Sequence, residues 1–222
     1  SLGYRDGNII DLRDATQADM VSVFGNERSF KAKLFNWIRP GESNVFVYYS
    51  GHGAPSLSTG QGYLLPVDAD PNTVEFNGYS LDTLFANLSS LPSKRLTVMI
   101  DSCFSGSSQA GTVVNNASSI SLKHVEIKAP IPNATVLSAA GGSEVASWDD
   151  EARLGLFTRH FLEGITGGAD KDKFGNGDGK VTLEELRCYL ASEVTYMARR
   201  LYNRDQHPQI SGTADKVLAV TK

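Results

Sequence analysis

The stretch Leu96-Thr-Val-Met-Ile-Asp101-Ser-Cys103-Phe-Ser-Gly106 decides how the rest of the chain is interpreted. Its first five residues are apolar or β-favouring, which predicts a short buried strand that stops at Asp101. A cysteine just beyond the carboxyl end of a buried parallel strand lies where open α/β sheets form their ligand crevice. Cys103 is therefore the first candidate for a catalytic residue.

A second stretch of the same build lies about fifty residues earlier. Val45–Tyr49 is strand-like, and Ser50-Gly51-His52-Gly53 follows it. If the two strands are parallel neighbours, His52 and Cys103 meet at one sheet edge as a base and a nucleophile. A lone cysteine is usually a small core residue and a lone histidine a turn residue, but the pair, each flanked by serine and glycine, is more specific. The glycines also leave backbone N–H groups free to hold an oxyanion.

These two motifs resemble the histidine and cysteine motifs of the caspase-like cysteine peptidases. The closest similarity is to the metacaspase and bacterial caspase-like (orthocaspase) branch, because Asp-Ser-Cys stands where true caspases have Gln-Ala-Cys. The resemblance continues through Ser147-Trp148 and Gly155-Leu156-Phe157, so it covers most of the chain. It implies an open, mostly parallel α/β sheet with helices on both faces. The family's first strand normally precedes the position of Ser1, so we expect this chain to lack it.

The resemblance implies a His52–Cys103 dyad, with Cys103 as nucleophile and His52 as proton shuttle. The backbone N–H groups of Gly53 and Cys103 are the candidates for the oxyanion hole. Ser50, Asp101 and Asp149 match positions that line the primary pocket. Two carboxylates there predict cleavage after Arg or Lys. The alternatives are that Asp101 caps a turn and that Asp149 belongs to a solvated acidic loop.

The leading functional hypothesis is thus a cysteine endopeptidase specific for basic residues, acting on proteins or peptides with exposed Arg or Lys. A related thiol peptidase of the asparaginyl or separase type is one alternative, although the two aspartates argue against it. A non-catalytic caspase-like module that recruits partners is the alternative from another class. The resemblance leaves a monomer or a weak dimer as the expected state.

We expect one peptidase domain over residues 1–222, made of a dyad-bearing half (1–106) and a half with the pocket loop (133–222). The connection, 107–132, is rich in Ser, Asn, Ala and Gly, which indicates an exposed segment open to proteolysis. Lys123 and Lys128 are its only Lys or Arg residues. We therefore predict self-cleavage after one of them, with Lys123 preferred because prolines crowd Lys128. The alternative is a long loop that is never cut.

The segment 170–185 resembles an EF-hand loop, with Gly179 at the sharp turn. The ligands expected for calcium are listed in chain order as Asp172, Asn176, Asp178, the Lys180 carbonyl and Glu185. The first ligand is out of place in this register, so Asp172 or Asp170 would have to reach in. The alternative is a capping box in which Thr182 and Glu185 start the following helix. The dyad itself needs no cofactor, so calcium is the one ligand besides substrate that we expect.

Composition narrows the class of protein. The chain has 222 residues, a net charge of -4 and a pI near 5.6, which argues against a nucleic-acid binder. It has no signal peptide and no apolar run long enough to cross a bilayer, so we expect no membrane partner. Its two cysteines, Cys103 and Cys188, imply no disulfide framework, and a reduced, cytoplasmic location fits a nucleophilic thiol. Cys188 falls in a predicted helix and is expected in the core.

Apolar periodicity predicts the remaining elements. We expect strands at Asn8–Leu12, Val45–Ser50, Leu96–Ile100 and Thr135–Ala140, and an edge strand at Val217–Val220. We expect helices at Ser29–Ile38, Ser80–Leu88, Leu156–Ile165 and Leu183–Asn203, and a hairpin or loop over Ala54–Asp70.

Overall fold

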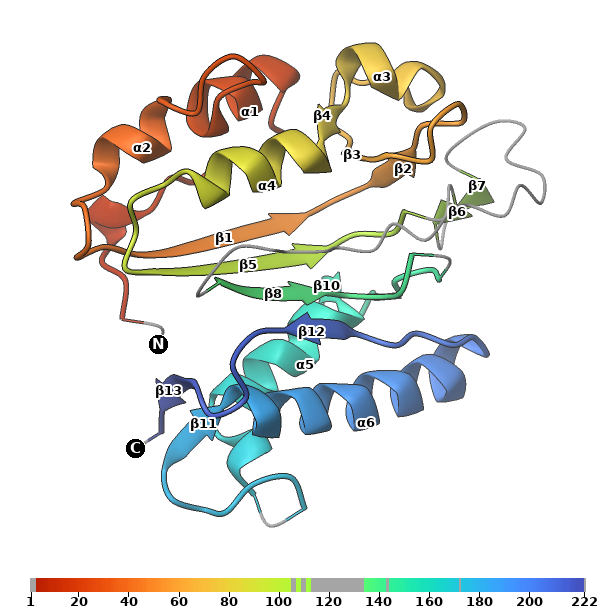
Figure 1. Cartoon of the computed structure of the whole chain (residues 1–222). Coiled ribbons are helices and arrows are strands. Elements are labelled where there is room, and N and C mark those ends of the chain that lie inside the picture. The colour runs from red at the N-terminus through yellow and green to blue at the C-terminus, as the bar shows by residue number, and fades with distance from the viewer. Residues whose placement is uncertain are drawn as a thin grey trace.

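A four-stranded sheet forms the centre of the protein in the computed structural model, which describes residues 3–104, 107–108, 111–112, 134–142, 144–171 and 173–221. Its strands stand in the order β1, β5, β8, β12 (Figure 1). They span Asn44–Ser50, Arg95–Asp101, Ala134–Ser138 and Gln209–Ser211. β1, β5 and β8 are parallel, and β12 runs antiparallel to β8. The predicted open, mostly parallel sheet is confirmed.

The position of β5 explains its sequence. It has a strand on each side and helices over both faces, so almost every residue is covered. Leu96, Val98, Met99 and Ile100 are between 0% and 3% exposed. A strand buried on both faces is a continuous apolar run rather than an alternating one. The stretch that ends in Cys103 is therefore the centre of the fold.

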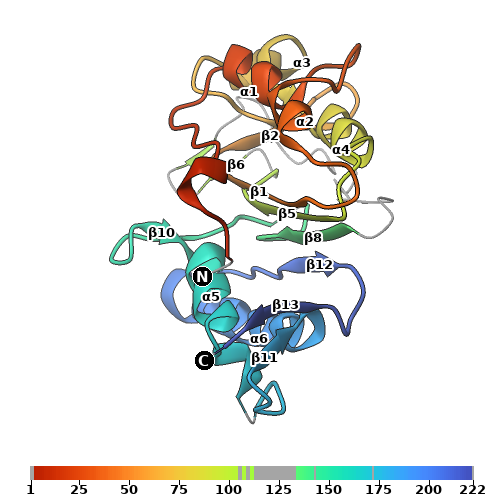
Figure 2. The ribbon, with the colours of Figure 1, turned by 90° about the vertical axis from the view of Figure 1, so that its left-hand side faces the viewer.

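Helices cover the sheet in two layers, which Figures 1 and 2 show from two directions. On one face lie α1 (Gln17–Phe24), α2 (Lys33–Trp37) and α4 (Leu81–Ser89). On the other lie α5 (Leu156–Ile165) and α6 (Leu183–Tyr202). Successive strand residues face opposite sides, so Ile100 packs in the core with Leu84 while Met99 packs in the core with Phe157. Each helical layer thus has its own hydrophobic core.

The two helices with the clearest start signals begin as the sequence predicts. At α4 the Ser80 hydroxyl accepts a hydrogen bond from the Thr83 amide. At α6 Thr182 and Glu185 form a reciprocal capping box, and the helix ends where Asn203 adopts a left-handed conformation with φ of 49°. The capping alternative for Glu185 is thereby confirmed. None of the described helices combines the length and apolar character needed to cross a bilayer.

Smaller elements complete the described chain. A three-stranded antiparallel sheet confirms the hairpin expected after the histidine motif, and it consists of β2 (Gly53–Pro55), β3 (Gly62–Leu64) and β4 (Tyr79–Ser80). Three two-stranded pairs are β6 with β7 (Ser107–Ser108, Gly111–Thr112), β9 with β10 (Trp148–Asp149, Leu154–Gly155) and β11 with β13 (Lys180–Thr182, Val217–Val220). The short helical turns are η1 (Asp6–Asn8), η2 (Pro71–Thr73), α3 (Val74–Asn77) and η3 (Gly168–Asp170).

Several expectations were wrong. No strand forms at Asn8–Leu12, where η1 ends and the chain continues without pairing in the described part. The helix expected at Ser29–Ile38 shrinks to α2, and part of its apolar pattern is instead an edge-on contact between the rings of Phe30 and Phe35. Val217–Val220 is a strand, but it pairs with β11, and the edge of the central sheet is β12. Cys188 is exposed because it lies on the outer side of α6.

Candidate active site

The ends of β1 and β5 meet as the sequence predicts. The parallel register pairs Ser50 with Asp101, and the Gly51 amide donates to the Asp101 carbonyl at 3.3 Å. His52 follows the last pair by two residues on one strand, and Cys103 follows it by two on the other. Backbone register alone therefore brings the two predicted dyad residues to one edge of the sheet.

Close packing of backbone tightens this junction. A Cβ added to Gly53 would lie 2.6 Å from the Cys103 carbonyl oxygen and 2.5 Å from the Phe104 ring. Only glycine fits there without displacing the nucleophile turn. The segment after His52 is thus in direct contact with the segment after Cys103. This proximity is compatible with the predicted oxyanion pair of Gly53 and Cys103, which stays a prediction.

The Cys103 thiol is held by the backbone of Ala146 in this conformation. The Ala146 amide donates to Sγ at 2.9 Å, and Sγ lies 3.5 Å from the Ala146 carbonyl oxygen. Burial raises the pKa of the Cys103 thiol to about 11, although the Ala146 amide bond opposes the rise. The His52 side chain is exposed, and among the described residues the thiol bonds Ala146 rather than His52. The Cys103 thiol is therefore protonated at neutral pH and partly buried in this conformation.

Tyr49 braces the histidine turn and was missed by sequence reasoning. Its hydroxyl donates to the His52 carbonyl at 2.7 Å, and the Leu65 carbonyl oxygen lies 3.2 Å from the same hydroxyl as a second acceptor within reach. The Leu65 amide also donates to the His52 carbonyl, at 2.9 Å. The backbone of His52 is thereby fixed although its ring is exposed. In the sequence Tyr49 only completes an apolar strand, so nothing signals this role.

Asp101 caps α5. Its carboxylate is 4% exposed and accepts from the Thr158 amide at 3.2 Å and from the Thr158 hydroxyl at 2.5 Å. The N-cap of α5, Gly155, has no side chain to offer, and a Cβ there would lie 2.0 Å from the Asp101 carboxylate. Burial raises the pKa of Asp101, while both Thr158 hydrogen bonds lower it. The capping alternative is thus supported, with a helix rather than a turn as the capped element.

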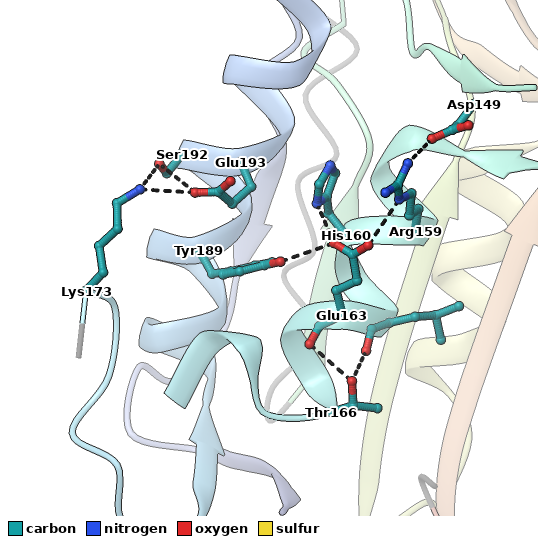
Figure 3. A network of polar contacts seen from close by, with 10 residues as sticks. Asp149, Arg159, His160, Glu163, Thr166, Lys173, Tyr189, Ser192 and Glu193 are labelled. Carbon is teal, nitrogen blue, oxygen red and sulfur yellow. Dashed lines mark hydrogen bonds and ion pairs between the residues drawn. The ribbon is translucent and has the colours of Figure 1, made fainter. Parts of the chain in front are cut away.

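Asp149 is buried and paired with a cation, so the alternative of a solvated acidic loop is wrong, while its pocket role stays a prediction. It is 5% exposed, accepts from the Ala152 amide at 2.9 Å and forms an ion pair with Arg159 (Figure 3). The Ala152 amide and then Arg159 lower the pKa of Asp149. Arg159 also donates to Glu163 at 3.0 Å, so its guanidinium lies between two carboxylates. The charge of Asp149 is therefore already balanced.

Ser50 is the last residue of β1 and is exposed, opposite Asp101 in the register. The two partners of the predicted pocket acids, Thr158 and Arg159, are consecutive in the first turns of α5. Sequence reasoning missed both. The only local signal was the glycine before α5, which left that helix without its own side-chain cap.

The EF-hand-like segment folds as a compact turn without a metal cluster in the described residues. The Asp170 carboxylate accepts from the amides of Gly177 and Gly179, both at 2.9 Å. The Asn176 and Asp178 side chains accept from amides two residues ahead, and the Glu185 carboxylate is used by the capping box. Asp172 lies outside the described residues. Calcium binding through this segment, including the Lys180 carbonyl, stays a prediction that calorimetric titration tests.

Lys123 and Lys128, the predicted self-cleavage sites, also lie outside the described residues, as does most of the connection 107–132. The structure therefore leaves the division into two halves as a prediction. The described site consists of the dyad edge, Asp101 and Asp149.

Comparison with known proteins places the chain in a family. The crystal structure of caspase-1 from Spodoptera frugiperda is similar, with 12% sequence identity and a TM-score of 0.46. That similarity covers 80% of this chain and 63% of the insect chain, so this chain spans less than two thirds of its length. No curated protein matches the chain. A sequence profile of the caspase domain matches residues 9–219, nearly the whole chain, and the protein therefore belongs to the caspase-domain family of cysteine peptidases.

Proposed function

We propose that this chain is a cysteine endopeptidase of the metacaspase or orthocaspase type, which cleaves after Arg or Lys with a His52–Cys103 dyad. The observation that carries the proposal is the junction of β1 and β5, where Gly53 packs on the Cys103 carbonyl. It brings a thiol and an imidazole to the ligand-binding edge of a parallel sheet. The substrates are proteins or peptides with exposed basic residues.

In the proposed reaction the Cys103 sulfur attacks the carbonyl carbon of the scissile peptide bond, and His52 takes the thiol proton. The tetrahedral oxyanion is held by the Gly53 and Cys103 amides. Its collapse breaks the C–N bond, and His52 gives the proton to the leaving amine. Water activated by His52 then attacks the thioester carbon, which releases the new carboxyl group and returns the proton to sulfur. Because the resting thiol is protonated, its proton must pass to His52 before or during the attack.

The charges around the site favour a single carboxylate as the group that binds the Arg or Lys side chain of the substrate. Asp149 is balanced by Arg159, whereas Asp101 has hydroxyl and amide donors and no cationic partner among the described residues. A substrate guanidinium or ammonium group would supply the missing positive charge. Asp101 is therefore the proposed determinant of specificity, with Ser50 at the exposed rim opposite it.

A peptide panel with Arg, Lys, Asn or Asp at the cleaved position tests the proposal. We expect turnover of the Arg and Lys peptides, its loss in Cys103→Ala, and its retention in Cys188→Ala, which removes the exposed second cysteine. Preference for Asn or Asp would contradict the specificity. A protein that turns over nothing and whose Cys103 resists a thiol-directed active-site probe would instead be a non-catalytic module.

Self-processing is part of the same proposal. An enzyme with an acidic pocket would cut its own connection after Lys123 or Lys128, and Lys123 is preferred because Pro130 and Pro132 crowd the second site. Mass spectrometry of the active protein beside Cys103→Ala tests this. Fragments that end at either lysine in the active protein alone support it, and intact chain or identical cuts in both samples contradict it.

A further inference from the structure

Gln206 is a polar side chain in a fully buried position. It is 0% exposed, and both ends of its carboxamide are used. Its Oε1 accepts from the Ser147 amide at 2.9 Å, and its Nε2 donates to the Ala139 carbonyl at 3.0 Å. Its own carbonyl accepts from the Thr195 hydroxyl on α6 at 2.9 Å. A buried amide whose oxygen and nitrogen both have a partner fixes its neighbours, because each broken bond would leave an unpaired polar group in the interior.

The two backbone groups that Gln206 binds are the two ends of one loop. The loop leaves β8 at Ala139, whose amide donates to the Ile100 carbonyl at 3.0 Å, and reaches Ser147 just before β9. Its described residues are 139–142 and 144–147, and we call this segment the thiol loop. Ala146, next to Ser147, is the residue whose backbone contacts the Cys103 sulfur. Gln206 is therefore linked to Cys103 by two hydrogen bonds, one to the Ser147 amide and one from the Ala146 amide to Sγ, and Ala146 and Ser147 are consecutive residues.

A second set of polar contacts joins the thiol loop to the segment that contains Gln206. The Glu144 carboxylate in the thiol loop accepts from the His207 amide at 2.7 Å and lies 2.5 Å from the His207 ring nitrogen Nδ1. It also accepts from the Gly141 amide at 3.1 Å, inside its own loop. Glu144 and His207 are more exposed than Gln206, so their bond is weaker in water. The buried carboxamide is thus the principal clamp on the thiol loop.

We propose that Gln206 is a positioning residue for Cys103, which acts by holding the thiol loop so that Ala146 covers and orients the sulfur. The inference rests on the proposed function in that Cys103 is the nucleophile. It adds a residue about one hundred positions further along the chain to the catalytic apparatus. Gln206 touches no reacting atom, so its effect passes entirely through the loop.

A merely structural role would look different. If Gln206 only filled space and satisfied two backbone groups, its loss would lower the melting temperature and leave the thiol unchanged. If it positions the loop, its loss alters the burial of Sγ, which raises the pKa of Cys103, and the Ala146 amide bond, which lowers it. The pH profile of the thiol therefore separates the two roles.

The experiment measures the rate of iodoacetamide alkylation at Cys103 against pH, followed by mass spectrometry of the Cys103 peptide. The variants are Gln206→Met, which keeps the volume and removes both bonds, and Thr195→Val, which removes only the hydroxyl that holds the Gln206 carbonyl. Gln209→Met is the matched control, because Gln209 is exposed and its amide donates to the His207 carbonyl rather than to the loop. Thr195→Val keeps the test open if the buried substitution prevents folding.

We expect the alkylation midpoint to fall by about half a pH unit or more in Gln206→Met and by less in Thr195→Val, because burial is the largest cause of the raised pKa. A rise would also show coupling, through loss of the Ala146 amide bond. The kcat/KM of Gln206→Met should fall about tenfold or more, mainly in kcat. Midpoints equal to that of Gln209→Met in both variants would overturn the proposal. Since alkylation needs no turnover, a shifted midpoint in a protein without peptidase activity would instead reject only the proposed function.

Discussion

The two sides of the site are built in different ways. The dyad edge, residues 50–53 and 101–104, is assembled by the register of two adjacent parallel strands. The pocket side, Asp101 and Asp149 with their partners on α5, is assembled by side chains that reach across from another layer. Backbone register follows from strand order, whereas side-chain partners depend on how a helix is rotated and placed. Motifs are therefore a better guide to which backbone segments adjoin than to which side chains pair.

Asp101 and Asp149, the two acids predicted to line the pocket, differ in the side-chain partners that the tertiary structure gives them. Both are about 95% buried, yet Asp101 is bonded to a hydroxyl and an amide and has a raised pKa, whereas Asp149 is paired with Arg159 and has a lowered pKa. A carboxylate that already has a resident cation adds little attraction for a second one. Counting acidic residues near a nucleophile thus overstates the charge that a substrate meets.

The largest effect is expected from Asp101→Asn. The carboxamide oxygen can still accept from Thr158, so the cap of α5 is kept while the charge is lost. We expect kcat/KM for Arg and Lys peptides to fall about 100-fold, as is typical when one partner of a buried charge pair is removed. Asp149→Asn is the matched variant and should lose far less. Equal losses in both would contradict the distinction between the two acids.

Thr158→Val tests whether Asp101 is a structural cap as well. The substitution removes the hydroxyl from a buried carboxylate and keeps the shape of the side chain. The free energy of unfolding should fall by about 1–3 kcal/mol, the cost of an unmade bond to a buried charged group. Urea denaturation measures it, with Thr166→Val as control because that exposed hydroxyl bonds only carbonyls of its own helix. A loss no larger than the control's would show that the hydroxyl bond adds nothing to the cap that the Thr158 amide makes.

Arg159→Gln should unmask Asp149. The guanidinium is 36% exposed, so the free energy of unfolding should fall by only about 0.5–1 kcal/mol. The selectivity for basic over neutral peptides should rise a few-fold as the freed carboxylate adds charge to the site. Arg187→Gln, which breaks the helical ion pair with Glu184, is the control for stability. Unchanged selectivity would place Asp149 outside the pocket.

His160→Gln should give the smallest effect, on the pH dependence of stability. His160 is 5% exposed and faces Glu163, Arg159 and Tyr189, with Glu193 further out (Figure 3). Burial lowers the pKa of His160 despite the attraction of Glu163. The folded state therefore binds this proton less readily than the unfolded state, so stability is full above pH of about 6.5 and is lost as pH falls.

Melting temperatures at pH 7 and pH 5 measure that loss. The wild type should lose more stability across this interval than His160→Gln, by up to about 1 kcal/mol. The remaining histidines and all carboxyl groups are common to both proteins and cancel in the comparison. Parallel curves would show that His160 binds its proton equally well in the folded and unfolded states, which would contradict the lowered pKa.

Much of the fold was predictable because its signals are local. The apolar run before Cys103, the serine cap of α4 and the capping box of α6 each specify an element through neighbouring residues. Elements whose local signal is weak or misleading were predicted wrongly, because only pairing with a distant strand decides whether they form. β12 has three residues with one apolar side chain, Ile210, so only its pairing with β8 reveals it as the sheet edge. Asn8–Leu12 has strand-like residues but no strand beside it in the described chain.

The sequence by itself determined the central parallel strands, the glycine-flanked turns after them and therefore the placement of the His52 and Cys103 segments at one edge of the sheet. These follow from apolar periodicity and strand order, which the chain carries in consecutive residues. Only the tertiary structure decided that Asp101 caps α5 through Thr158, that Arg159 balances the charge of Asp149, and that Gln206 bonds the loop next to the thiol. Such contacts join residues 10 to 59 positions apart, and they depend on how α5 and α6 pack on the sheet rather than on any local pattern.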